Sequence, residues 1–297
     1  MFEFLASTFG YLLQFLYNLV NNYGIAIILF TITIKIILLP LSIKQQKTMK
    51  KSAKMQEKIK VIQFKYKNDQ EKMNQEMMNL YKSENMSPIS GCLTTIIQML
   101  LLLSIFYLVR TPLTYMQKIP QENINTYIGQ LKEGEKTVSN VYPEIDLIRE
   151  YNYLKELNPE DENVDKLNLQ MNFLGLDLSK IPQQNMSDYT VYIIPVLYIL
   201  SSFVSIRLTT SMQTKKKVEN KDITIDGKTG EKLELEESKN NEPDSMAQTN
   251  KIMSWMMPIL SISIAFVAPL GLALYWLINN VLMIIERLVL DKVLKES

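Results

Sequence analysis

The amino-acid sequence predicts an all-α, polytopic membrane protein with five transmembrane helices, an N-terminal interfacial helix and a cytoplasmic helical hairpin. Three observations support this fold class. The 297 residues are 47% hydrophobic and 21% charged, and the two kinds of residue occupy separate blocks. Several apolar blocks approach or exceed the ~20 residues with which a helix crosses ~30 Å of hydrocarbon. One polar block, residues 44–87, repeats apolar residues at the spacing of a helix.

The N-terminal segment, residues 1–22, is apolar but carries polar side chains. It lacks the basic region and the small-residue cleavage site of a signal peptide. Phe4, Leu12, Phe15 and Leu19 can share one broad face of a helix. We therefore expect an amphipathic helix that lies in the membrane interface. A sixth span over the same residues is the alternative.

Five later blocks are long and apolar enough to cross a membrane. The predicted spans are residues 23–43, 88–110, 189–210, 252–268 and 270–290. Pro269 and Gly271 interrupt the last apolar run, so the fourth and fifth spans are expected to form a tight helical hairpin.

The charges of the loops predict the orientation of these spans. Residues 44–86 contain 11 Lys against 5 Asp and Glu, whereas residues 111–188 contain 7 Lys and Arg against 13 Asp and Glu. Loops rich in Lys and Arg remain in the cytoplasm. We therefore expect residues 111–188 outside the cell, with the N-terminus, and the tail of residues 291–297 in the cytoplasm.

The polar blocks are expected to differ in order. Residues 44–87 should form two antiparallel helices, with Asn68 as the cap of the second helix. The methionines of this hairpin either pack its two helices together or offer an adaptable surface to partners. Residues 111–188 are expected to be an extracellular loop or small subdomain. Residues 211–251 are polar and are expected to be a flexible cytoplasmic loop.

A lysine, Lys35, lies in the middle of the first predicted span. A charge at the bilayer centre costs about 2.5–3.5 kcal/mol on insertion scales. No Asp or Glu lies deep in a predicted span, and Glu286 lies near the cytoplasmic end of the last one. We therefore expect water to solvate the ammonium in a positively charged cavity within the membrane. A neutral Lys35 that is buried by its neighbours is the alternative.

Polar residues spaced four apart could line such a cavity, because they share a helical face. The candidate residues of this substrate groove are Lys35 with Thr31, Thr94 with Gln98, Ser201 with Ser205, Tyr275 with Asn279, and Trp276 with Asn280. The alternative is that the hydroxyl groups bond to their own helix or join neighbouring helices.

Composition argues against catalysis. The chain has no histidine, and its single cysteine, Cys92, excludes an internal disulfide and a cysteine-based zinc site. No pair of carboxylates is expected in a pocket. We therefore expect no enzyme activity, no cofactor and no metal, and we interpret Cys92 as a packing residue. The net charge of +1 provides no field to attract nucleic acid.

Several segments carry a family resemblance. They are "YGIAIILFTITIKIILLPLSIKQ" at residues 23–45, "SPISGCLTTIIQMLLLLSIFY" at 87–107, "FLGLDL" at 173–178, "MMPI" at 256–259 and "PLGLALYWLINN" at 269–280. In this order they resemble the YidC/Oxa/Alb family of membrane protein insertases. Three positions depart from the family pattern: Lys35 replaces the usual arginine, and Ser87 and Thr94 replace the usual asparagine and proline. A lysine keeps the charge but lacks the planar fork of arginine.

The resemblance implies a membrane protein insertase and chaperone of the bacterial plasma membrane, similar to Gram-positive members. It implies a hydrophilic groove through which hydrophilic segments of small membrane proteins pass, with Lys35 as the basic residue and Trp276 facing the groove. Nascent membrane proteins and the lipid bilayer are the implied partners, with or without the ribosome and the Sec translocon. Two rival interpretations remain: a small-solute transporter, which predicts internal repeats, and an assembly factor that does not insert its partners.

Overall fold

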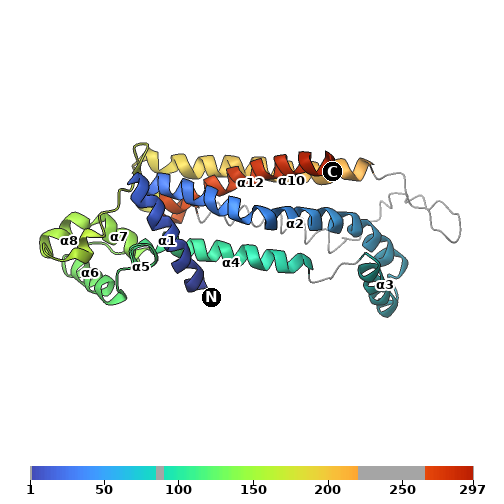
Figure 1. The fold of residues 1–297 in the computed structure, drawn as a ribbon, viewed down its shortest axis with the longest axis horizontal. Helices are drawn as coiled ribbons and strands as arrows, with labels where there is room; N and C mark the ends of the chain where they lie inside the picture. Colours follow the sequence, from blue (N-terminus) through green and yellow to red (C-terminus); the bar gives the residue numbers. More distant parts are fainter. Residues whose placement is uncertain (1, 85–89, 220–264, 297) are drawn as a thin grey trace.

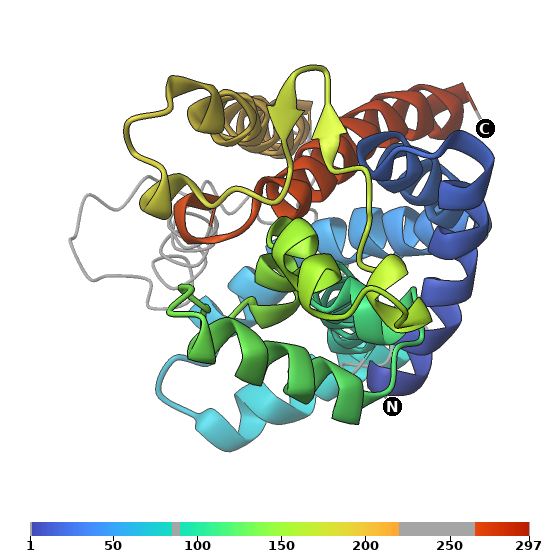
Figure 2. The same ribbon diagram turned by 90° about the vertical axis from the view of Figure 1, so that its left-hand side faces the viewer.

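The protein is described by a computed structural model that covers residues 2–84, 90–219 and 265–296. Long helices run along the longest axis, and a group of short helices occupies one end (Figure 1). The helices along this axis are α2 (Tyr23–Lys65), α4 (Ser90–Arg110), α10 (Ile193–Glu219) and α12 (Leu270–Glu296), whereas α1 (Phe2–Val20) runs across them (Figures 1 and 2).

Within the described residues, three helices are long and apolar enough to cross a membrane. They are Tyr23–Thr48, Tyr189–Leu208 and Leu270–Val293, and Met99–Arg110 in α4 is a shorter apolar stretch. The chain is thus helical and has several candidate spans, whereas the count of five stays a prediction. Most of the predicted span 252–268, and residues 220–251 of the predicted loop 211–251, lie outside the described part of the chain.

Helix α2 continues well beyond the first predicted span. It is unbroken from Tyr23 to Lys65 and contains Pro40. A proline inside a membrane helix is tolerated because neighbouring groups satisfy the backbone that it leaves unpaired. The apolar span therefore leads directly into a polar helix without a turn.

Helix α3 (Gln70–Ser83) packs against α2. The Nζ of Lys58 lies 2.6 Å from the Oε1 of Glu84, and Lys51 donates a hydrogen bond to the backbone carbonyl of Glu84. The cap of α3 is Asp69, whose carboxylate accepts from the backbone N–H of Lys72, so the expected cap at Asn68 is wrong by one residue. The cytoplasmic location of this pair of helices stays a prediction.

Helix α1 packs against α2 and α4. Its contact with α5 (Pro112–Tyr115) is close, because a Cβ at Gly10 would overlap the backbone carbonyl of Tyr115. One face of α1 is buried, and the other exposes Phe4, Phe15 and Leu19, as the periodicity predicts. Leu12, which was expected on the same face, is instead half-buried and packs against the hydrophobic core. Whether this helix lies on the membrane or spans it stays a prediction.

Residues 111–188, the loop unit, are folded at one end of the molecule (Figures 1 and 2). The unit contains α5, α6 (Gln121–Glu133), α7 (Pro143–Arg149), α8 (Tyr151–Leu157), α9 (Glu162–Asp165), an antiparallel pair of strands, β1 (Asn172–Phe173) and β2 (Leu176–Asp177), and the 3-10 helix η1 (Pro182–Gln184). A second 3-10 helix, η2 (Tyr189–Tyr192), leads into α10.

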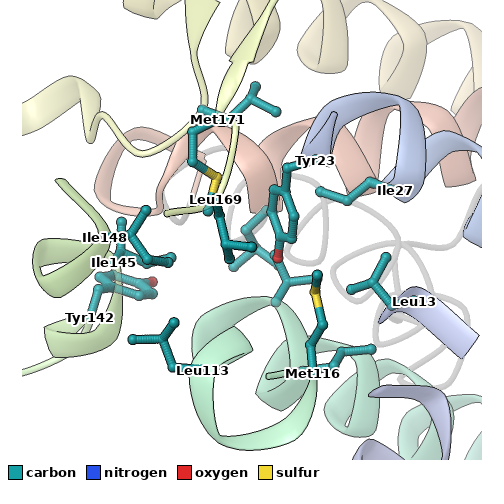
Figure 3. Packing of buried hydrophobic residues seen from close by; sticks show 14 of the residues in the cluster. Leu13, Tyr23, Ile27, Leu113, Met116, Tyr142, Ile145, Ile148, Leu169 and Met171 are labelled. Atoms are coloured by element: carbon teal, nitrogen blue, oxygen red, sulfur yellow. The ribbon is translucent and has the colours of Figure 1, made fainter. Parts of the chain in front are cut away.

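The loop unit shares its hydrophobic core with the long helices. Figure 3 shows buried side chains of the unit, among them Leu113, Met116 and Ile145, together with Leu13 of α1 and Tyr23 of α2. These residues belong to one cluster. The unit is therefore packed onto the helix ends rather than tethered to them.

The loop unit also sets the direction of two spans. The backbone N–H of Tyr23 donates to the carbonyl of Gln170 at 3.0 Å, and the N–H of Gly271 donates to the carbonyl of Leu178 at 2.9 Å. Helices α2 and α12 therefore begin at the same end of the molecule. They also pack against each other. This arrangement determines which residues of the two helices can meet.

Candidate intramembrane polar site

The central feature of the site is an ion pair between α2 and α12. The Nζ of Lys35 lies 3.2 Å from the Oε2 of Glu286, and these side chains are 25% and 16% exposed. The expectation that Lys35 has no counter-ion in the spans is therefore wrong. A water-filled positive cavity is not needed to explain how the lysine is accommodated, because a paired charge is much less costly in a membrane than an isolated one.

The sequence alone does not bring Glu286 close to Lys35, because it does not show that α2 and α12 run side by side. At 1.5 Å per residue, Lys35 lies about 18 Å from the start of α2 and Glu286 about 24 Å from the start of α12. Both helices start at the same end. The offset is small compared with the combined reach of the two long side chains, so the pair can form.

A second polar cluster joins α10 and α12. The side-chain N–H groups of Asn280 donate to the hydroxyl of Ser201 at 2.9 Å and to the hydroxyl of Ser202 at 3.1 Å. Ser201 in turn donates to the carbonyl of Tyr198 at 2.8 Å. Asn280 is buried, with 7% of its surface exposed. This cluster is the interhelical bonding that the alternative interpretation of the pairs predicted.

The remaining predicted groove residues have different surroundings. Thr31 is buried and donates to the carbonyl of Ile27 at 2.7 Å, which satisfies its hydroxyl within α2. Trp276 is half-buried, with its ring centroid 6.0 Å from that of Tyr198. Tyr275 is buried in the hydrophobic cluster.

The last four candidates are Ser205, Asn279, Thr94 and Gln98. Ser205 is buried and Asn279 is half-buried. The side chains of Thr94 and Gln98 lie outside the described part of the structure. Whether any of the ten candidates lines a groove therefore stays a prediction.

Helix α12 is the common element of the site, because it carries both Glu286 and Asn280. Sequence reasoning missed Glu286 as a partner of Lys35 and Ser202 as an acceptor for Asn280. One signal was available: Glu286 is the sole acidic residue within residues 270–290. An isolated acid in one apolar helix and an isolated base in another are candidates for a pair.

The site holds no recognisable place for a metal. In residues 2–84, 90–219 and 265–296, no group of three or more Cys, Asp or Glu side chains is arranged to bind an ion. The arrangement can pair charges and exchange hydrogen bonds between helices.

These features define a helical, multi-pass membrane protein that carries a charged pair and an amide–hydroxyl cluster between its candidate spans. A sequence model of the 60Kd inner membrane protein family matches residues 15–297. The chain belongs to this family.

Curated relatives of the chain are each named "Membrane protein insertase YidC". The one from Clostridium perfringens is 47% identical over 98 residues, which are 33% of this chain and 41% of the relative. The one from Buchnera aphidicola is 45% identical over 105 residues, which are 35% of this chain and 20% of the relative. The one from Caldanaerobacter subterraneus is 39% identical over 107 residues, which are 36% and 52% of the two chains. The matched segments therefore span between a fifth and about half of these three relatives.

Proposed function

We propose that the chain is a membrane protein insertase and chaperone that passes hydrophilic segments of small membrane proteins through an intramembrane groove. The family match over residues 15–297 supports the activity, since the relatives carry the name insertase. The ion pair of Lys35 and Glu286 supports its location, because charged groups inside membrane helices are costly and mark functional sites.

The physical task of an insertase is to lower one barrier. The apolar helix of a substrate enters lipid favourably, at a few tenths of a kcal/mol per apolar residue. Its hydrophilic flank does not, because each charge must cross a region of low dielectric constant. Polar side chains between α2, α10 and α12 shorten that region. Lys35 offers a partner to acidic flanks, and the membrane potential then acts on their charge.

The proposed setting is the bacterial plasma membrane, with the N-terminus outside and the C-terminus in the cytoplasm. Nascent membrane proteins are the proposed substrates. The pair of helices formed by α3 and the end of α2 carries lysines and exposes Phe64, which suits contact with the ribosome or the Sec translocon. The chemistry needs no covalent step and no cofactor.

Insertion into liposomes that contain this chain alone tests the proposal. The substrate is a small single-span protein with a hydrophilic tail, and protection of the tail from protease measures its passage. We expect protection with the purified chain and none in protein-free liposomes. A chain that binds the substrate stably but never protects its tail would be an assembly factor instead.

The role of the lysine has its own test. We expect Lys35→Ala to slow the insertion of acidic tails more than that of neutral tails. Lys44→Ala is the matched control, because it removes a lysine from an exposed position of the same helix. Equal slowing of acidic and neutral tails would show that Lys35 does not capture acidic segments, although the groove itself would remain possible.

A further inference from the structure

The geometry of the ion pair leaves Lys35 able to bind a second acidic group. Lys35 uses one hydrogen bond toward Glu286, and an ammonium group has three donors. A quarter of its side chain is exposed, so another carboxylate has access. In the described part of the chain, Lys35 is also the one side chain that donates a hydrogen bond to Glu286.

We propose that Glu286 competes with the acidic side chains of a substrate for Lys35, and that this competition sets the charge preference of the site. The inference rests on the proposed function and adds a residue that determines specificity. In the resting protein the pair is neutral, so the site does not attract acidic segments as a free lysine would. An acidic segment binds only when it displaces or shares the carboxylate of Glu286.

The electrostatic preference of the site depends on the number of charges that meet there. Among Lys35, Glu286 and the substrate, a substrate carboxylate beside an unpaired Lys35 gives no net charge, whereas the same carboxylate beside the intact pair leaves one negative charge in excess. Arg287, which interacts electrostatically with Glu286, adds the same charge in both cases. Like charges brought into a medium of low dielectric constant repel strongly. Glu286 therefore penalises acidic segments relative to neutral ones. This electrostatic repulsion does not act on neutral segments.

The ion pair can open without disrupting the packing of the helices that carry it. The two side chains come from helices that are packed by many apolar neighbours, among them Phe30, Ile34 and Leu274. Separating the charged groups does not require these apolar contacts to open. Exchange of one carboxylate for another can thus occur within a folded protein.

Competition between Glu286 and the substrate is tested by comparing tails that differ only in charge. Three versions of one single-span substrate carry Asp, Asn or Lys at the same tail positions. Insertion rates are measured in liposomes with the wild-type chain, E286Q, K35Q/E286Q and the control D291N. The control removes an acid from the same helix beyond the pair.

We expect E286Q to raise the ratio of acidic to neutral insertion about fivefold, which corresponds to about 1 kcal/mol. The double variant K35Q/E286Q should lose this gain, and D291N should keep the wild-type ratio. An unchanged or lower ratio in E286Q, with wild-type rates intact, would overturn the inference. Absence of insertion by the wild-type chain would instead overturn the proposed function.

A charge swap covers the case in which E286Q does not fold. K35E/E286K keeps an ion pair between the same helices, so it should fold and keep a competing carboxylate. We expect its ratio of acidic to neutral insertion to be close to that of the wild type. A swap that raises the ratio several-fold would show that the carboxylate does not compete.

Discussion

The loop unit buries charged side chains and the spans partly bury them, but the two regions satisfy these groups in different ways. In the loop unit, the carboxylate of Glu144 accepts hydrogen bonds from the backbone N–H groups of Leu113 and Thr114, at 2.7 and 3.1 Å, and from the hydroxyl of Thr114. In the spans, Lys35 and Glu286 satisfy each other through a single contact between side chains.

Exposure separates the two cases further. Glu144 and Asp146 are 2% and 1% exposed, whereas the side chains of Lys35 and Glu286 are 25% and 16% exposed. A carboxylate that caps backbone groups of α5 cannot leave without unfolding the backbone that it holds. A side-chain pair between two helices can separate while both helices remain. The first arrangement belongs to the fold, and the second is suited to exchange.

The largest expected effect is the loss of stability of the loop unit when Glu144 is replaced. Glu144→Ala should destabilise the loop unit by about 3 kcal/mol, because it leaves the buried N–H of Leu113 and the partly buried N–H and O–H of Thr114 without an acceptor. Urea unfolding in detergent, followed by pulse proteolysis of the loop unit, measures the loss. Glu156→Ala on α8 removes an exposed acid of the same unit and should change little. Equal stability of the two variants would mean that Glu144 does not hold α5.

The second effect is a dependence of the stability on pH. Burial raises the pKa of the Glu144 carboxyl from 4.5 to about 6, although the hydrogen bonds from Thr114 and Leu113 oppose this. A raised pKa means that the folded unit binds the proton more tightly than the unfolded chain. Its contribution is therefore full below pH 4.5 and is lost as the pH rises through 6.

From pH 7 to pH 4.5, we expect the loop unit to gain about 2 kcal/mol from this group. Burial also raises the pKa of the Asp146 carboxyl, which adds to the gain at the acidic end of this range. Pulse proteolysis across this range measures the slope, and Glu144→Gln should remove most of it. If Glu144→Gln keeps the full dependence of stability on pH, groups other than Glu144 cause it.

The third effect tests whether the two side chains of the span pair interact. Lys35→Gln and Glu286→Gln should each lower the thermal stability in detergent, because each leaves one partly buried charge unpaired. The double variant should recover most of the loss, with a coupling energy of about 1 kcal/mol. Losses that simply add in the double variant would show that the two side chains do not interact.

The difference between the two regions also explains which structural features could be predicted from the sequence. Apolar runs of sufficient length predict spans, and the exposed face of α1 with Phe4, Phe15 and Leu19 follows from periodicity. These are local patterns. The folded state of residues 111–188 depends on contacts such as Tyr23 with Gln170, which join residues far apart in the chain. Such contacts leave no periodic signal.

The candidate site shows the same limit. Lys35 is recognisable in the sequence because it is a charged residue within an apolar run. Asn280 and Ser201 are recognisable because each shares a helical face with another polar residue four positions away. Their pairing was not identified, because it depends on α2 and α12 beginning at the same end and packing side by side. Two partners 251 residues apart can be matched from the sequence only when both are exceptions in their own helices.

The smallest expected effect concerns the uncharged contact between spans. Asn280→Ala removes the hydrogen bonds to Ser201 and Ser202, and such bonds within membranes contribute about 0.6 kcal/mol on average. Thermal unfolding in detergent measures the change, with Asn279→Ala as the neighbouring control. Asn280 also lies on the helix that carries Glu286, so its loss should leave the acidic-to-neutral insertion ratio unaltered if the ion pair alone sets charge preference. A shift of that ratio in Asn280→Ala would show that the amide cluster and the ion pair act as one site.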